Sequence, residues 1–373
     1  MKKISVFLLA VLLLSLLTSC GGTDYPPVQS SELESTVVMT LKIEDEEYDV
    51  KYELYRALFL NIRDEIDGGD RSVWSGESKD GYVARADAEI KRQIADIYSV
   101  LHVADKIGID VYSSEFDEII EETIALSVEG GYYGGDKLIG FGGDYDAYLS
   151  HLRDINLNYS VHDLLLRYEI AASRIFDYHA GYTDGQFLEE YVQGELKFTK
   201  EDVKNFYNNN EECVRVIRAH LPKSTFTAQK AEEKRQKLCE IEIYGEEAVV
   251  NYVIGLGVPT ADSDIANGML IAKHSLDSAY YAEFVEVAFA LEYFEVSEVV
   301  EVFTGDTNSS GYNILYKIGK SDEHFENCYE SIEAVYIQNQ IGKIIDTAAD
   351  TLLSSAQNTP FLNALDRATI SMQ

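Results

Sequence analysis

The chain has 373 residues, of which 65 are Asp or Glu and 31 are Lys or Arg, so its formal net charge at pH 7 is -34. An acidic chain is repelled by nucleic acid and by anionic lipid headgroups, so neither is expected as a binding partner. The charge itself fits either a solvated acidic face or an attraction for basic, unfolded secreted chains.

The N-terminus predicts a lipoprotein signal peptide over residues 1–19. Two lysines precede the apolar run of residues 4–17, which is too short for a comfortable membrane-spanning helix. The run ends in Leu-Thr-Ser before Cys20, as in a bacterial lipobox, so we expect acylation of Cys20 and a polar tether over residues 20–35. Acyl chains contribute about 0.8 kcal/mol per buried CH₂ and would hold the protein on the extracytoplasmic face of the cell membrane. The alternative is an ordinary secretory signal with a chance cysteine.

Residues 36–210 predict a helical domain that begins with a hairpin over residues 36–50. Amphipathic helices follow over residues 51–66 and 85–109, and further helices begin at Ser113 or Ser114 and at Thr199, which are good N-caps. The acidic loop over residues 64–80 fits a solvated loop better than a calcium site, because it lacks the ligand spacing of an EF-hand.

Residues 211–320 change in character and predict a small domain of mixed helices and strands. They contain 18 of the 65 acidic and 10 of the 31 basic residues. Strands are expected over residues 213–224 and 311–318, and a helix over 227–245. Residues 283–303 read as a short helix that runs into a strand. Residues 321–373 then predict a long helix that returns to the first domain.

Cysteine and motif patterns exclude several site types. Apart from Cys20 there are three cysteines, and an odd number without paired spacing argues against a disulfide framework. The sequence has no CxxC, HExxH, Walker or GxGxxG motif, so no metal and no cofactor are expected.

Three segments resemble a parvulin-type peptidyl-prolyl isomerase: RVIRAHLPK, AEFVEVAFALEYFEVSEVV and GYNILYKI. The whole chain resembles a PrsA/SurA-like extracytoplasmic foldase, through YELYRALFL, VADKIGIDVYSSEFDEII and FTKEDVKNFYNNN. The resemblance implies an α+β fold, in which a mostly helical SurA-N-like chaperone body carries an inserted parvulin-like domain. It also explains the helix-to-strand join, because in that family the short helix presents a Phe to the proline pocket.

The resemblance assigns site residues one by one. His220 falls on the family's first-strand His, and Asn313 replaces the second His in the closing strand. Phe284 falls on the Phe that packs on the substrate proline, Phe289 backs the pocket, and Tyr280 stands where the family has Met or Leu. Asp262 or Asp264 takes the place of the family's Cys or Asp. Gly268 alone remains of a glycine-rich bend, and Phe294 replaces the Gly usual before "EVS".

These departures predict a foldase with weak or lost isomerase activity. Its partners would be unfolded or newly exported polypeptides, and the 26 Tyr suit a cleft for them, because Tyr offers apolar area together with a hydroxyl. They suit an ordinary helical body equally well. A non-catalytic envelope-binding or adhesion lipoprotein is the alternative function, in which His220 is a satisfied strand-face residue and the fold survives as a scaffold.

Overall fold

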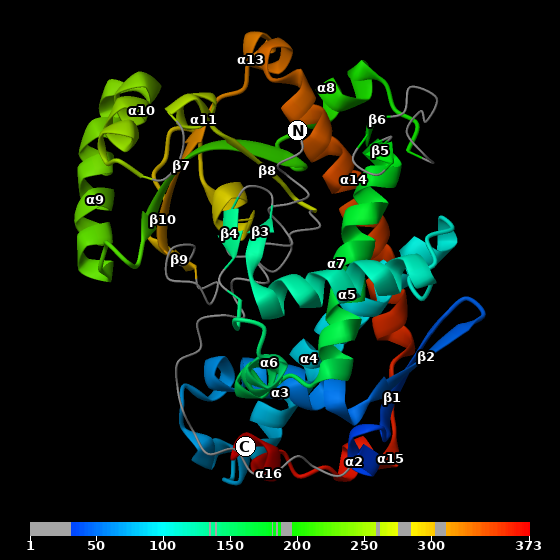
Figure 1. Cartoon of the computed structure of the whole chain (residues 1–373). Coiled ribbons are helices and arrows are strands. Elements are labelled where there is room, and N and C mark those ends of the chain that lie inside the picture. Colours follow the sequence, from blue (N-terminus) through cyan, green and yellow to red (C-terminus); the bar gives the residue numbers. More distant parts are fainter. Residues whose placement is uncertain are drawn as a thin grey trace. The chain divides into compact units, whose positions relative to one another are not determined.

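The protein has an α+β fold, seen here in a computed structural model that describes residues 31–133, 136–138, 140–180, 182–183, 186–187, 196–258, 262–274, 285–302 and 311–373 (Figure 1). Its contacts divide the chain into two units. The first comprises residues 1–175 together with 344–373, and the second comprises residues 176–343. Two long helices, α7 (Tyr159–Ala180) and α14 (Tyr329–Ser355), continue from one unit into the other.

The first unit joins the two ends of the chain in one small antiparallel sheet of order β11-β1-β2. Its strands are β1 (Val37–Ile43), β2 (Glu46–Lys51) and β11 (Gln357–Asn358), and a separate hairpin is formed by β3 (Gly131–Tyr133) and β4 (Asp136–Leu138). The helices that lie wholly within this unit are α2 (Ser31–Glu34), α3 (Tyr52–Asp67), η1 (Arg71–Trp74), α4 (Lys79–Lys106), α5 (Ser114–Glu129), α6 (Tyr145–Asp154), α15 (Pro360–Ala364) and α16 (Arg367–Ser371).

Local chemistry sets the ends of these helices. The Ser113 hydroxyl accepts a hydrogen bond from the backbone N–H of Phe116 and caps α5, as the sequence predicted. Helix α3 ends at Gly68, whose φ of 60° is the left-handed conformation that glycine adopts without penalty.

The acidic loop after α3 uses its carboxylates internally. Asp67 accepts hydrogen bonds from the Trp74 indole at 2.7 Å and from the Arg71 guanidinium at 2.7 Å, while Asp70 caps η1 through the backbone N–H of Ser72. Among the described residues, no group of three His, Cys, Asp or Glu side chains could hold a metal ion. The loop is therefore organised by Arg71 and Trp74.

The second unit is built on a four-stranded antiparallel sheet of order β8-β7-β10-β9 (Figure 1). Its strands are β7 (Cys213–Pro222), β8 (Met269–Ala272), β9 (Val300–Val302) and β10 (Gly311–Ile318), and a two-stranded hairpin is formed by β5 (Tyr182–Thr183) and β6 (Gln186–Phe187). The helices are α8 (Lys200–Asn208), α9 (Ala228–Ile241), η2 (Glu242–Tyr244), α10 (Glu246–Gly255), α11 (Asp262–Asn267) and α13 (Asp322–Asn327), and residues 285–290 are also helical.

Strand alternation gives this sheet two apolar faces. Ile217, Ala219 and Leu221 of β7 pack with α9 and α10, whereas Val214 and Val216 pack on the other face with the helix of residues 285–290. Because His220 and Arg218 share the parity of Val216, their side chains belong to the second face. The candidate site is therefore on the face opposite α9 and α10.

Three elements differ from the sequence-based expectation. Strand β8 was not predicted, because Met269–Ala272 is only four residues long. The long C-terminal helix begins as two pieces, α13 and α14, because the backbone leaves the helical conformation at Cys328, whose φ is -116° and ψ 19°. The strand expected from Val296 pairs there by a single bridge to Tyr316 and continues as β9 only from Val300.

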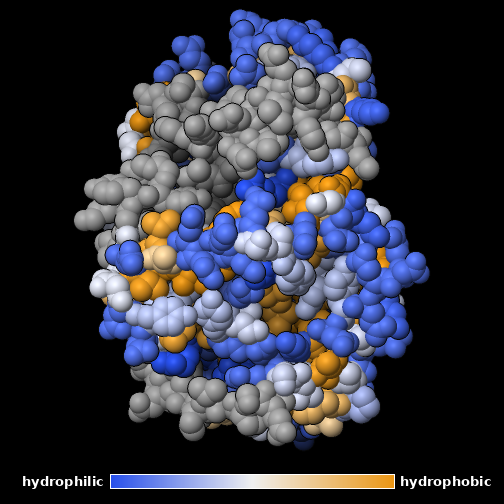
Figure 2. All heavy atoms as spheres, turned by 45° about the vertical axis from the view of Figure 1, so that its right-hand side comes forward, coloured by the Kyte–Doolittle hydropathy of each residue, from blue (hydrophilic) through white to orange (hydrophobic). Residues whose placement is uncertain are grey.

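The surface reflects the composition of the chain. Figure 2 shows that hydrophilic residues cover most of the described surface on the face in view, with hydrophobic residues in separate areas. No helix among the described residues has both the length and the apolar character needed to cross a bilayer.

Candidate functional site

His220 and Asn313 lie directly opposite each other on the two central strands of the second unit. The register of β7 and β10 pairs these two residues, and the His220 Nδ1 lies 2.9 Å from the Asn313 Oδ1. Both side chains are buried: His220 is 8% exposed and Asn313 is 0% exposed. The structure thus brings together two of the residues that the sequence proposed.

Arg218 is a third member of this polar group, and the sequence analysis missed it. Its Nε donates to the Asn313 Oδ1 at 2.9 Å, and its Nη2 lies 3.3 Å from the His220 Nδ1. A guanidinium only donates, so the Asn313 atom that it faces is the carbonyl oxygen. A proton on the His220 Nδ1 lets this atom donate to the same oxygen; the Arg218 Nη2 then makes only a close contact with Nδ1, because two donors do not hydrogen-bond to each other. The period of two along a strand would have revealed Arg218, because residues 218 and 220 share a face.

The Asn313 amide nitrogen is left with donor capacity to spare. With Oδ1 turned toward Arg218 and His220, Nδ2 is buried and has no hydrogen-bond partner among the described residues. An unsatisfied buried donor costs roughly 1–3 kcal/mol. Because Asn313 is fully buried, this donor does not reach a surface that a ligand could contact, and neither Asn313 nor His220 is among the residues that line the neighbouring pocket.

An apolar floor lies on the same face of the sheet. Phe289, from the helix of residues 285–290, is partly buried against a cluster that includes Val216, Ala288 and Leu315. The predicted backing residue thus packs on the sheet face that carries His220. Such a floor suits an apolar ring better than a charged group.

Gly268 allows the chain to turn closely over the sheet just before β8. Its φ is +71°, and a Cβ there would lie 2.9 Å from the Ile318 Cδ1 and 3.1 Å from the Val216 carbonyl oxygen. A side chain would therefore be excluded both by the left-handed backbone and by the close approach. The sequence analysis expected this glycine as the remnant of a glycine-rich bend, and that assignment stays a prediction.

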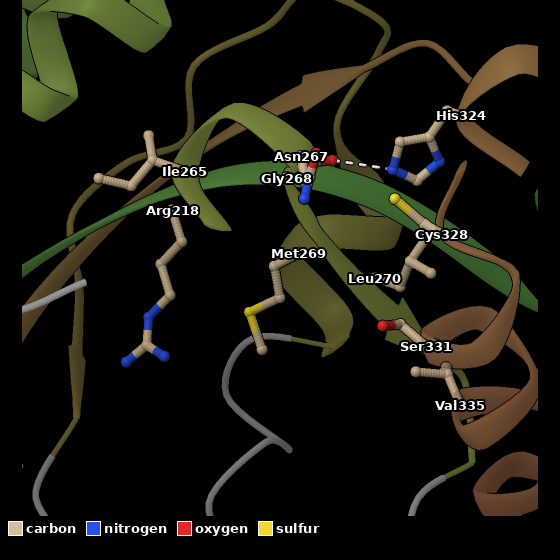
Figure 3. A pocket seen from close by; sticks show the side chains of 10 residues that line it. All are labelled: Arg218, Ile265, Asn267, Gly268, Met269, Leu270, His324, Cys328, Ser331 and Val335. Atoms are coloured by element: carbon tan, nitrogen blue, oxygen red, sulfur yellow. Dashed lines mark hydrogen bonds between the residues drawn. The ribbon is translucent and has the colours of Figure 1, made fainter. Parts of the chain in front are cut away.

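A pocket of about 310 Å³ adjoins the polar group, with Arg218 in its wall. Figure 3 shows Arg218 at one end and His324 at the other, with Met269 of β8 between them. His324 is fixed by the Asn267 carbonyl oxygen at 3.0 Å and by the Tyr207 hydroxyl at 2.9 Å. Burial and the nearby Arg215 guanidinium lower the pKa of His324.

The cysteines of this unit are free thiols, and Cys328 lines the pocket. Burial raises the pKa of Cys213 to about 12, so that thiol stays protonated and unreactive at neutral pH.

Several predicted site residues lie outside the described part of the chain. These are Tyr280 and Phe284, the side chains of Asp262 and Asp264, and the predicted lipidation site Cys20. Asp262 is the first residue of α11. Their roles stay predictions.

No protein-family model matches the chain, and neither does any curated protein. Its likenesses among solved structures include PrsA from Bacillus subtilis, at 14% identity and a TM-score of 0.23 over 74% of this chain and 87% of that one. Foldase protein PrsA from Streptococcus pneumoniae matches at 15% identity and a TM-score of 0.25, over 70% of this chain and 83% of that one. The foldase PrsA from Lactococcus lactis matches at 12% identity and a TM-score of 0.23, over 90% of this chain and 100% of that one. TM-scores this low do not establish a common fold, so these likenesses add nothing to the geometry described above.

Proposed function

We propose that this protein is a membrane-anchored extracytoplasmic chaperone or foldase for exported polypeptides, with a parvulin-like domain of weak or lost isomerase activity. The observation that carries the proposal is the pairing of His220 with Asn313 in the centre of the sheet, above an apolar floor that includes Phe289. The order of elements supports it as well: among the described residues, α9, η2, α10 and α11 lie between β7 and β8 in the sequence, and the helix of residues 285–290 lies between β8 and β9.

Prolyl isomerisation requires no covalent chemistry from the site. No bond breaks, and the enzyme lowers a rotation barrier of about 18–20 kcal/mol. The apolar floor would hold the proline ring, and the polar group would have to favour the twisted amide over the planar one. In this chain the Asn313 Oδ1 accepts from Arg218 and lies 2.9 Å from the His220 Nδ1, and the Asn313 side chain is fully buried, so this pair has little capacity left to act on a ligand carbonyl.

Binding and catalysis should therefore separate. Burying one apolar side chain is worth about 1.5–3 kcal/mol, which is enough for weak and promiscuous contact with polypeptides. Favouring the twisted amide needs the polar partners as well, and the replacement of the second His by Asn weakens that preference. We expect Phe284→Ala to reduce peptide binding and His220→Ala to change it little.

A coupled assay of proline isomerisation, run beside an assay of aggregation suppression, tests this function. We expect slow isomerisation in the wild type, a faster rate in Asn313→His, and undiminished aggregation suppression in His220→Ala. Circular dichroism checks that each variant is folded. If the wild-type rate equals that of an ordinary parvulin and His220→Ala abolishes it, the protein is an active isomerase and the proposal of weak or lost activity is wrong. Absence of aggregation suppression would instead favour the binding or adhesion lipoprotein.

Detergent partitioning tests the anchor. The full-length protein should enter the detergent phase when it is produced in a lipoprotein-processing host, and Cys20→Ala should stay in the aqueous phase. Cys239→Ala is the matched control, because it also removes one thiol but leaves the predicted acylation site intact. If wild type and Cys20→Ala partition alike, the anchor proposal fails.

A further inference from the structure

Phe294 adopts a backbone conformation that its side chain disfavours. Its φ is +66°, in the left-handed region where a Cβ is costly and glycine is not. Its N–H donates to the Lys317 carbonyl oxygen at 2.8 Å, which fixes the turn between the helix of residues 285–290 and the sheet. Glycine would make the same turn without strain, so the turn itself does not explain the aromatic side chain.

Burial does not explain it either. Phe294 is 55% exposed and its neighbour Tyr293 is 43% exposed. The Phe294 ring lies 6.3 Å from the Tyr293 ring and 6.4 Å from the Tyr316 ring. Tyr293 is held in place by Asn210, which accepts from its hydroxyl at 2.8 Å, and by the Lys317 ammonium 5.5 Å from its ring centre. The two exposed aromatic rings are thus presented on an ordered support.

A second exposed apolar pair flanks the same support. Ile243 and Tyr244 of η2 are each 75% exposed. Tyr316 connects the two pairs: its ring faces Phe294, and it shares an apolar cluster with Ile241, the residue just before η2. The Tyr316 hydroxyl is buried and has no hydrogen-bond partner among the described residues.

The exposed charges next to these residues include several carboxylates, and Lys237, which lies near Tyr244, is paired with Glu240 at 2.7 Å. Glu292 and Glu295 are exposed on either side of Tyr293 and Phe294, and Glu247 is exposed beside η2. The one lysine beneath the rings, Lys317, is buried and donates from Nζ to the Leu291 carbonyl oxygen at 2.6 Å. A second copy of this chain would bring its own acidic rim and a net charge of -34, so charge favours a cationic partner.

We propose that Tyr293, Phe294, Ile243 and Tyr244 form a docking surface for a cationic polypeptide segment that carries apolar side chains. Strained backbone conformations are found mostly at functional sites, where the strained residue contributes to binding or catalysis. Exposed aromatic residues bordered by carboxylates can bind a partner that is both basic and apolar. The surface is distinct from the His220–Asn313 pair, because Phe294 bonds to residue 317, four residues along β10 from Asn313, or about 13 Å at about 3.3 Å per residue. It does not depend on isomerase activity.

Fluorescence anisotropy with the full-length chain tests this surface. The probe is a labelled 12-residue peptide of alternating Lys and Leu, compared with Glu/Leu and Lys/Ser peptides of the same length. We expect only the Lys/Leu peptide to bind well, and more weakly at high salt. Phe294→Gly should weaken its binding at least tenfold while leaving Tm unchanged or higher, because glycine relieves the left-handed strain. Tyr244→Ser, at a position too exposed to affect folding, should weaken binding as well.

Tyr112→Ser is the matched control, since Tyr112 is an exposed aromatic residue of the first unit at 65% exposure and should leave the affinity unchanged. Unchanged affinity in both Phe294→Gly and Tyr244→Ser overturns the proposal, as does an equal loss in Tyr112→Ser. Equal affinity for the Glu/Leu peptide would remove the charge argument. If sedimentation shows a dimer that Phe294→Gly abolishes, the occupant is a second copy and the assignment of a cationic partner is wrong.

Discussion

His220 keeps its position in the sheet because the residue beside its ring is glycine. A Cβ at Gly311 would lie 2.5 Å from the His220 Cε1 and 2.8 Å from the Leu221 carbonyl oxygen. The backbone oxygen of Leu221 cannot move aside as the end of a flexible side chain can. Gly311→Ala must therefore displace the His220 imidazole or separate β7 from β10. We expect a loss of roughly 1–3 kcal/mol in the free energy of unfolding, measured in urea.

Gly319→Ala provides the control for that substitution. It lies just past the same strand, and a Cβ there would meet nothing within 4 Å. Its effect should stay within about 0.5 kcal/mol. Equal effects of the two substitutions would show that His220 does not pack as described.

Glu46 gives the first unit a pH dependence. Hydrogen bonds from the Tyr48 hydroxyl, His102 and Lys106 outweigh its partial burial and lower the pKa of Glu46 from 4.5 to about 2. Because this folded-state pKa lies below the unfolded value, ionised Glu46 stabilises the fold above pH 4.5, and the contribution is lost as the pH falls from 4.5 toward 2. We expect Glu46→Gln to melt at a lower temperature than the wild type at pH 7, with the difference shrinking over that range. A difference in Tm that stays constant from pH 7 to pH 2 would contradict the assignment.

At the scale of elements, the C-terminal helices α15 and α16 hold the first unit together. Arg367 is 5% exposed, donates from Nη2 to Asp87 of α4 at 2.8 Å and from Nε to the Tyr55 hydroxyl of α3 at 3.1 Å. It also donates to the Leu362 and Leu365 carbonyl oxygens, both at 2.7 Å. One buried guanidinium thus ties α3, α4 and both C-terminal helices together.

Arg367→Ala should be among the most destabilising single substitutions in this unit. Removing one partner of a buried ion pair leaves the Asp87 charge uncompensated and costs about 3–5 kcal/mol. Urea unfolding followed by far-ultraviolet circular dichroism would measure the loss. Lys42→Ala is the control, because the Lys42–Glu47 pair is 52% exposed on both sides and such pairs contribute about 0–1 kcal/mol. A loss for Arg367→Ala no larger than that of the control would mean that the bonds of Arg367 do not hold these helices to the unit.

At the scale of the whole molecule, the contacts set the limits of the second unit wider than residues 211–320. Helices α8 and α13 and the start of α14 belong to it, and they form an apolar cluster of Val203, Tyr207, Phe325 and Ile332. A second cluster, of Phe206, Cys213 and Ala272, joins α8 to the sheet. Among the described residues, every apolar cluster that packs against the four-stranded sheet therefore lies within residues 196–343.

A fragment of residues 196–343 should fold by itself, with one cooperative urea transition. A fragment of residues 211–320 keeps the sheet but loses all four buried residues of the α8–α13–α14 cluster, and we expect it to unfold at lower urea or without cooperativity. Burial of each such side chain is worth about 1.5–3 kcal/mol, so the difference should be large. Equal stability of the two fragments would favour the narrower limits.

The sequence by itself determined what depends on near neighbours along the chain. The mixed helix and strand pattern of residues 211–320, the cap at Ser113 and the strands that carry His220 and Asn313 follow from periodicity and capping, which are local properties. The resemblance to parvulins also placed Asn313 in the closing strand. Its pairing with His220, however, depends on the register of β7 and β10.

Only the tertiary structure decided what depends on register and packing between distant segments. The second partner of the Asn313 Oδ1, besides His220, is Arg218, which lies 95 residues away in the sequence, and the short strand β8 exists because it pairs with β7. The left-handed backbone of Phe294 is held by a hydrogen bond from its N–H to the Lys317 carbonyl oxygen across the turn. A phenylalanine in the sequence does not predict this conformation, because a residue with a Cβ rarely adopts it. Such features cannot be read from periodicity, because local preference is overridden wherever distant parts of the chain fix the backbone.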